Sequence, residues 1–205
     1  MTEIIFYTNP MSRGRIARWM LEEIGAPYHT EILSYDDMKS PGYLSVNPMG
    51  KVPAIAHAGS VVTECAAICA YLADIFPDAG LGPRKGEHAD FYRWMFFAAG
   101  PVEAAVTDQA LGVVIPPERK GMVGYGCMEE VLDALEAHFA THDFVTGGRF
   151  TAADVYVGSQ IRWGLGFRSI PARPAFVAYA DRLGERPALI RATEMDDALI
   201  PAKES

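Results

Sequence analysis

Two short stretches of the chain carry residue types that could hold a small peptide ligand. The first is Val52-Pro53, which precedes the apolar residues Ala54 and Ile55. Proline has no amide hydrogen, and a bond from any residue to proline is the one peptide link that adopts the cis form at small cost. A cis bond here would turn the backbone donor and acceptor of Val52 outward, and an extended ligand could then pair with that backbone.

The second stretch begins at Glu64, just before the helix-like run that starts at Cys65. The free amides in the first turn of such a helix, together with its positive end, favour a carboxylate. The carboxylate of Glu64 could meanwhile accept hydrogen bonds from an ammonium group. A ligand with an α-amino acid head and a peptide body satisfies both demands.

The elements that must position these residues follow from local patterns. Residues 3–8 are β-branched and aromatic and stop at an Asn-Pro pair, so they predict a first strand. Apolar residues recur at helical spacing over 12–24, where Ser12 is suited to the N-cap and Gly25 to the C-cap. Further strands are expected at 28–33, 52–57 and 60–63, and a helix at 64–76. This order predicts a thioredoxin-like arrangement.

Beyond Pro77 the pattern changes, and no convincing strand follows. Glycine and proline in the next few residues predict a linker, and helical spacing predicts helices at 88–109, 118–142, 152–167, 174–185 and 187–197. We therefore predict a thioredoxin-like domain at 1–77, a linker at 78–86 and an all-helical domain at 87–205.

Composition excludes several classes of function. The chain has 205 residues and a net charge of -8, which argues against a nucleic-acid partner because such partners select a basic surface. Its cysteines, Cys65, Cys69 and Cys127, are odd in number and predict no disulfide framework. No secretory leader and no run of membrane-spanning length is expected, so we predict a cytoplasmic protein with no membrane partner.

Several motifs together resemble the cytosolic glutathione S-transferase family, in its bacterial form with serine at the catalytic position. The resemblance covers almost the whole chain, and it rests on the order and spacing of the motifs at 7–12, 18–25, 47–54, 64–68 and 150–155. It implies a thioredoxin-like α+β domain that binds glutathione, an all-α domain that binds an electrophile, a homodimer and a role in detoxification.

By this resemblance, Ser12 is the catalytic residue. Its hydroxyl would donate to the sulfur of glutathione and, with the positive end of the helix, lower the pKa of the thiol, since the thiolate is the attacking form. The alternative is that Ser12 only caps its helix. Tyr7 is another candidate donor. No Cys-x-x-Cys pair lies in this turn, so disulfide exchange lacks its nucleophile.

The resemblance also assigns the residues that would bind glutathione. Cysteine stands at 65 where the family carries serine. The swap costs little if the ligand contact runs through the backbone amide, but it lowers the affinity by one charged hydrogen bond, about 1.5 to 3 kcal/mol, if the hydroxyl is needed. Lys39 and Lys51 are candidates for the glycyl carboxylate. The predicted glutathione-binding residues are Lys39, Lys51, Val52, Pro53, Glu64 and Cys65.

The electrophile pocket and the remaining patterns are less defined. Met11, Phe97 and Trp163 are candidates for the pocket, and Glu103 for a contact with the ammonium group of a ligand across a dimer. His138 and His142 lie four apart but lack the further ligands of a zinc site, so no metal is predicted. A box beginning at Thr151 and closing at Asp154 predicts a structural helix start.

The expected function is transfer of glutathione to an electrophilic small molecule, without a metal. One alternative is a glutathione-binding module with little turnover, because a fold does not fix a function. Another is a glutathione-dependent isomerase or dehalogenase, although the serine-serine-cysteine run of such isomerases is replaced here by Pro10-Met11-Ser12-Arg13.

Overall fold

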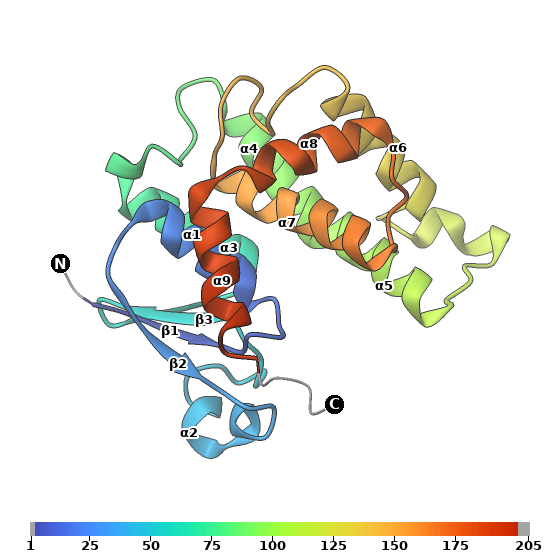
Figure 1. Cartoon of the computed structure of the whole chain (residues 1–205). Coiled ribbons are helices and arrows are strands. Elements are labelled where there is room, and N and C mark those ends of the chain that lie inside the picture. Colours follow the sequence, from blue (N-terminus) through green and yellow to red (C-terminus); the bar gives the residue numbers. More distant parts are fainter. Residues whose placement is uncertain (1–2, 201–205) are drawn as a thin grey trace. The chain divides into compact units, whose positions relative to one another are not determined.

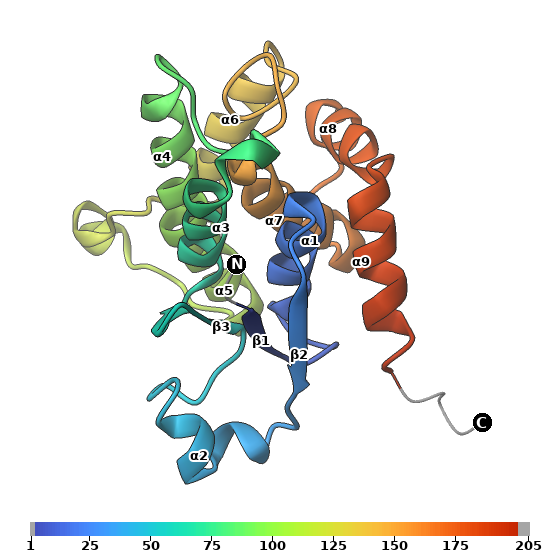
Figure 2. The same cartoon turned by 90° about the vertical axis from the view of Figure 1, so that its left-hand side faces the viewer.

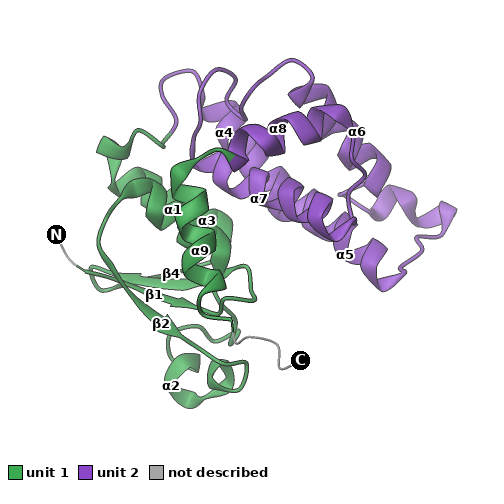
Figure 3. Cartoon of the chain, in the orientation of Figure 1, with its two compact units in different colours: residues 1–82, 185–205 green, residues 83–184 purple. Residues whose placement is uncertain are grey.

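The computed structural model describes residues 3–200, which pack as two compact units (Figure 3). Residues 3–82 and 185–200 form the first unit, and residues 83–184 form the second. Within the described range, every helix is too short or too polar to cross a membrane. The predicted order of a thioredoxin-like sheet domain followed by helices is confirmed.

A four-stranded sheet with the order β2-β1-β3-β4 lies in the first unit (Figures 1 and 3). Strand β1 pairs in parallel with β2 and antiparallel with β3, and β3 pairs antiparallel with β4. The third strand begins at Ala54 and not at residue 52, because Pro53 has no amide to give to the ladder. The strands are β1 (Ile4–Thr8), β2 (Tyr28–Ile32), β3 (Ala54–His57) and β4 (Ser60–Thr63).

Helices α1 (Gly14–Ile24) and α3 (Cys65–Ile75) cover one face of the sheet, and the short α2 (Pro41–Leu44) lies on its other side (Figures 1 and 2). The predicted C-cap of α1 is confirmed, since Gly25 has a φ of 66°. The sequence did not predict α2, which is capped by the Ser40 hydroxyl. Short 3₁₀ turns at Asp37–Lys39 and Pro77–Ala79 complete the connections.

Helix α9 (Pro187–Asp197) packs beside α1 and so belongs to the first unit (Figure 3). Ion pairs join Arg15 to Asp197 at one end and Glu23 to Arg186 at the other, which makes the two helices antiparallel. The division of the chain therefore differs from the predicted one, which placed 185–205 with the helical domain. Sequence spacing identified the helix, but its packing partner, α1, lies far away in the chain.

All named secondary-structure elements of the second unit are helical. A π-helical segment at Ala98–Val102 contains Pro101 and interrupts the single helix predicted over 88–109, because proline cannot donate to the helical ladder. The helix predicted over 118–142 starts only at Met128, after a 3₁₀ turn at Pro117–Met122. The helices are α4 (His88–Phe97), α5 (Glu103–Leu111), α6 (Met128–Phe139), α7 (Ala152–Phe167) and α8 (Pro174–Gly184).

Candidate functional site

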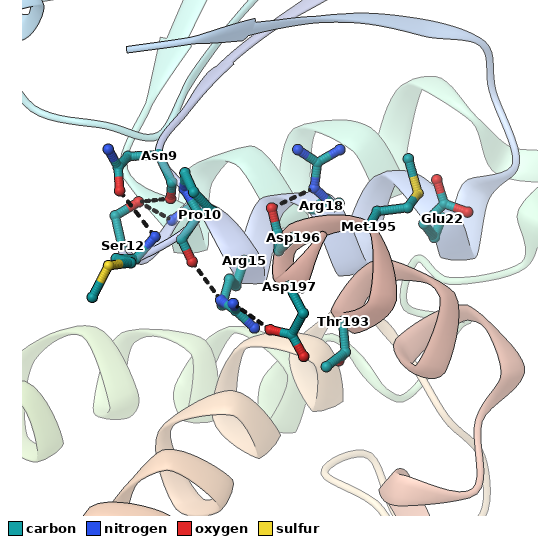
Figure 4. Close-up of polar contacts among 12 residues, drawn as sticks. Asn9, Pro10, Ser12, Arg15, Arg18, Glu22, Thr193, Met195, Asp196 and Asp197 are labelled. Carbon is teal, nitrogen blue, oxygen red and sulfur yellow. Dashed lines mark hydrogen bonds and ion pairs between the residues drawn. The ribbon is translucent and has the colours of Figure 1, made fainter. Parts of the chain in front are cut away.

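The turn between β1 and α1 holds the Ser12 hydroxyl in a defined position (Figure 4). Its oxygen donates to the carbonyl of Asn9 at 2.7 Å and accepts from the amide of Gly14 at 2.9 Å. Helix α1 begins at Gly14, so Ser12 lies just before the N-cap and still satisfies one of the amides that a helix start leaves unpaired. Ser12 thus lies at a helix start and is partly exposed.

Asn9 fixes the shape of this turn. Its side chain accepts from the amide of Met11 at 2.9 Å and donates to the carbonyl of Leu33 at 2.8 Å. Gly14 lets the turn approach the end of β1, because an added Cβ would lie 1.9 Å from the hydroxyl oxygen of Thr8. The Ser12 turn, defined here as Asn9 to Arg13, is therefore held on both sides.

The Val52-Pro53 peptide bond is cis, as the sequence predicted. Within the described range, neither backbone polar group of Val52 has a hydrogen-bond partner, and the residue is partly exposed. The carbonyl of Lys51 just before it is held twice, by the Tyr43 hydroxyl at 2.6 Å and by the Asn47 amide at 2.8 Å. Burial raises the pKa of Tyr43 to about 12, so its hydroxyl stays a neutral donor.

The start of α3 combines backbone strain with an exposed carboxylate. Glu64 has a φ of 66°, a conformation that costs a non-glycine residue about 1 to 3 kcal/mol and that gathers at functional sites. Its side chain is exposed and makes no capping bond to α3. The thiol of Cys65 is buried and donates to the carbonyl of Arg13 at 3.5 Å.

Strand register brings these three features together at one end of the sheet. Ala54 is opposite Tyr7 of β1 on one side and opposite Thr63 of β4 on the other. Because both pairings are antiparallel, Val52 lies beside the chain that leaves β1 toward the Ser12 turn, and the chain that leaves β4 enters α3 at Glu64. The contact of the Cys65 thiol with Arg13 closes this arrangement.

The two candidate lysines differ in their surroundings. The ammonium group of Lys39 donates to the carbonyls of Met49 and Gly50, at 3.1 and 2.9 Å. Lys39 thus braces the loop that leads to Val52, whereas the side chain of Lys51 is exposed. Their predicted contact with a ligand carboxylate stays a prediction.

The residues predicted for the electrophile pocket come from different units. Met11 is 69% exposed in the Ser12 turn, whereas Phe97 and Trp163 are half-buried on α4 and α7 of the second unit. Glu103, also in the second unit, accepts a hydrogen bond from Gln160 at 2.7 Å. The pocket and the role of Glu103 therefore stay predictions.

Other titratable groups are placed where they serve the fold. Burial raises the pKa of the Cys69 thiol, and the neighbouring Cys65 adds to the effect, so Cys69 is no thiolate nucleophile. The rings of His138 and His142 stack with their centroids 4.5 Å apart. Over residues 3–200, no cluster of three or more histidine, cysteine or acidic side chains could hold a metal ion.

Sequence reasoning gave no functional role to Asn9, Arg15, Tyr43 or Asn47. Asn9 and Asn47 stand before prolines in the motifs that carry the resemblance, and that position was the available signal. Tyr43 follows an unpredicted helix start, and Arg15 contacts a residue far away in the chain, so neither contact has a local pattern.

This fold joins a thioredoxin-like sheet domain to an all-helical domain. Models of the N-terminal and C-terminal domains of glutathione S-transferases match residues 11–75 and 124–182, together more than half of the chain. The chain belongs to the glutathione S-transferase family.

Three known proteins illustrate this relationship. Glutathione S-transferase psoE of Aspergillus fumigatus is 30% identical over 134 residues, which is 63% of this chain but only 56% of that protein. Elongation factor 1-gamma of Prunus avium is 27% identical over 132 residues, 62% of this chain and 31% of that protein. The theta class glutathione S-transferase of Xanthomonas axonopodis pv. citri, solved with glutathione bound, is 28% identical with a TM-score of 0.75, over 94% of this chain and 98% of that one.

Proposed function

We propose that this chain is a glutathione transferase in which Ser12 stabilises the thiolate of glutathione for attack on an electrophilic small molecule. One observation carries the proposal: the register at Ala54 brings the Ser12 turn, the unpaired backbone of Val52 and the start of α3 to one end of the sheet. A tripeptide needs a donor for its sulfur, an edge for its backbone and an ion partner for its γ-glutamyl head, and these three features supply them.

Each part of the tripeptide has a proposed partner. The backbone of Val52 pairs with the cysteinyl unit, and the exposed carboxylate of Glu64 accepts from the ammonium group. The γ-glutamyl carboxylate lies at the amides of the first turn of α3, where Cys65 begins the helix. Lys51 approaches the glycyl carboxylate, while Lys39 mainly holds the loop through its two carbonyl contacts.

The chemistry requires a lowered thiol pKa. The Ser12 hydroxyl turns its hydrogen from the Asn9 carbonyl to the sulfur, while its oxygen keeps the bond from the Gly14 amide. The hydrogen bond from the Ser12 hydroxyl to the sulfur and the positive end of α1 favour the thiolate over the thiol. The thiol releases its proton to solvent water. The thiolate sulfur then forms a bond to an electrophilic carbon, and the leaving group departs with its electron pair. Ser12 keeps its proton throughout, and proximity supplies the rest of the acceleration.

The partners of the reaction belong to the same proposal. Met11, Phe97 and Trp163 contribute to the electrophile pocket, and the protein works as a cytoplasmic homodimer in detoxification. The support is the family to which the chain belongs. Size-exclusion chromatography with light scattering tests the dimer, and a monomer at micromolar concentration would contradict it.

The test of the function is a conjugation assay with glutathione and a chloronitroaryl electrophile. Ser12→Ala removes a hydrogen bond to a charged sulfur, worth about 1.5 to 3 kcal/mol, so kcat/KM should fall about 10- to 150-fold. Ser45→Ala removes an exposed serine hydroxyl of the same unit and should change nothing. Full activity in Ser12→Ala would exclude Ser12 and make Tyr7 the next candidate. Absence of glutathione binding by calorimetry would exclude the whole proposal.

A second candidate is a glutathione-binding module with little turnover. Two observations favour it: the similarity to an elongation factor 1-gamma, and the hydrogen bond that already engages the Ser12 hydroxyl within its own turn. Calorimetric binding of glutathione, with no conjugation across several classes of electrophile, would select this candidate.

A further inference from the structure

The geometry points to a positioning role for Asp197 at the end of α9: through Arg15 it holds the Ser12 turn in the conformation that the reaction needs. This inference rests on the proposed function, since it concerns the residue that would stabilise the thiolate. It adds a contribution from α9 to a proposed glutathione site that is otherwise built from residues 9 to 65.

A single guanidinium joins the two parts (Figure 4). The Nε of Arg15 donates to the carbonyl of Pro10 at 2.6 Å, and its Nη2 donates to the Oδ1 of Asp197 at 2.6 Å. Pro10 lies within the Ser12 turn, between Asn9 and Met11. The carboxylate of Asp197 therefore orients the guanidinium through one charged hydrogen bond, and the guanidinium holds the Pro10 carbonyl through another.

The charges on the two helices are arranged against the rule for isolated helices. An isolated helix favours acids at its N-terminus and bases at its C-terminus. Helix α1 has Arg15 in its first turn and Glu22 and Glu23 in its last, while the last turn of α9 contains Asp196 and Asp197 and no base.

Each of these unfavourable charges has its partner on the other helix or, for Glu23, at Arg186 just before α9. Four ion pairs run along the antiparallel contact, and their nitrogen-to-oxygen distances lie between 2.6 and 3.2 Å. The charges at the ends of α1 and α9 oppose the helix dipoles but are paired between the two helices. This indicates that α1 and α9 are matched as a pair. Arg15 is the member of this set that contacts the Ser12 turn, and Asp197 is its partner on α9.

Helix α9 does not depend on Asp197 for its docking. Arg18 and Asp196 form a buried pair at 2.7 Å, and Arg186 makes two bonds to Glu23 at 2.6 and 2.7 Å. The side chain of Asp197 is 59% exposed. Removing its charge should therefore leave α9 in place and loosen only the link from Arg15 to Pro10.

Loosening that link should affect catalysis more than binding. Ser12 directs its hydroxyl to the sulfur only while the turn keeps its shape, whereas Val52 and Glu64 hold the tripeptide at separate positions. Asn9 still ties the turn to Leu33 and Met11, so the loss should be partial. We expect kcat to fall about three- to tenfold, less than the roughly 100-fold cost of a 1 Å misplacement of a reacting group.

The experiment compares Asp197→Asn with Glu194→Gln. Glu194 is an exposed acid on the same helix, and no side-chain contact is found for it in the described range, so the two variants change charge equally. Asp197→Asn should lower kcat, leave KM for glutathione within about twofold and leave the unfolding midpoint unchanged. Glu194→Gln should match the wild type in all three. Asp197→Glu, which keeps the carboxylate, should restore most of the kcat.

A second measurement reads the turn without any substrate. The amides of Met11 and Ser12 donate to the side chain and the carbonyl of Asn9, at 2.9 and 3.1 Å. In Asp197→Asn their hydrogen exchange should become faster, and in Glu194→Gln it should not. Unchanged exchange in Asp197→Asn overturns the inference, even if the protein is an active transferase. Faster exchange supports it, even if no electrophile tested reacts, which separates it from the proposed function. Equal kcat in the two variants of an active enzyme also overturns it.

Discussion

Arg18 of α1 and Asp196 of α9 form an ion pair inside the first unit, with Nε and Oδ1 2.7 Å apart (Figure 4). Their side chains are 2% and 1% exposed. Burial raises the pKa of Asp196, while the charge of Arg18 and its hydrogen bond oppose the rise. Within the described range, Nη2 of Arg18 and Oδ2 of Asp196 have no hydrogen-bond partner, so the pair holds one strong bond at a considerable desolvation cost.

Removing one member of this pair should be far more damaging than removing both. Asp196→Ala leaves the Arg18 charge buried and should cost about 3 to 5 kcal/mol in the free energy of unfolding. Arg18→Met with Asp196→Leu keeps an apolar volume and should recover most of that loss. Urea unfolding followed by circular dichroism measures both. A loss below about 1 kcal/mol for Asp196→Ala would mean that the charge reaches water and that the pair behaves as a surface contact.

Gly14 should not tolerate a methyl group. An added Cβ would lie 1.9 Å from the Thr8 hydroxyl oxygen and 3.0 Å from that of Ser12, so Gly14→Ala should displace the start of α1. Overpacking of this kind costs about 1 to 3 kcal/mol. The Thr8 oxygen is buried without a partner in the described range, so Thr8→Ala should be tolerated and should rescue Gly14→Ala. The same urea titrations check this, and a double variant no more stable than Gly14→Ala would contradict the assigned clash.

Asp154 should make the second unit more stable in mild acid, not less. Its carboxylate accepts from the amides of Val145 and Thr151 and from the hydroxyls of Thr151 and Tyr179, at 2.7 to 3.1 Å. Full burial nevertheless raises its pKa from 3.8 to about 6. A raised pKa means that the folded chain binds the proton more tightly than the unfolded chain, so stability is greatest below about pH 4 and is lost as pH rises through 6.

The size of this effect follows from the shift. A change of about two pKa units corresponds to roughly 3 kcal/mol of unfolding free energy between pH 4 and pH 7. Asp154→Asn should be less stable, because a carboxamide offers one acceptor oxygen in place of two, and it should lack this pH dependence. Urea unfolding at pH 4, 5, 6 and 7 gives both slopes. Equal slopes in the two proteins would show that Asp154 keeps an ordinary pKa.

Much of this fold could be predicted because local residue patterns mark the helices and strands. The capping box at Thr151 and Asp154 and the proline before Ala188 fix the helices at 152–167 and 187–197, and both are confirmed. Helix α2 was not predicted because its four residues are too few for a periodic pattern. The π-helical segment that contains Pro101 was not predicted either, because no local residue pattern indicates one.

The candidate site divides in the same way. The cis bond at Val52-Pro53 and the helix start at Glu64 were visible as residue types in order. The direction of the Cys65 thiol toward Arg13 was not visible, since it depends on how α3 meets the Ser12 turn. The link from Asp197 to Arg15 depends on a helix pairing across most of the chain, which no local window contains.

The double brace on the Lys51 carbonyl should set the affinity for glutathione. Tyr43 and Asn47 donate to that oxygen at 2.6 and 2.8 Å, and the next residue, Val52, offers its backbone to the ligand. Tyr43→Phe removes one hydrogen bond worth about 0.5 to 1.5 kcal/mol. Part of the free energy of binding must then order the loop that leads to Val52, so glutathione binding measured by calorimetry should weaken about 2- to 12-fold.

The rate at saturating glutathione should change little in Tyr43→Phe, since Ser12 is untouched. The control is Tyr71→Phe on α3. It removes a hydroxyl that is bonded to His57 of β3, away from this loop, and should leave the affinity for glutathione unchanged. Burial raises the pKa of Tyr43 to about 12, so the difference between wild type and Tyr43→Phe should be constant from pH 6 to about pH 9. A loss of kcat without a loss of affinity would instead indicate that Tyr43 takes part in the reaction. If Tyr43 acts only by holding the backbone next to Val52, it changes the affinity for the tripeptide and not the rate at which its sulfur reacts.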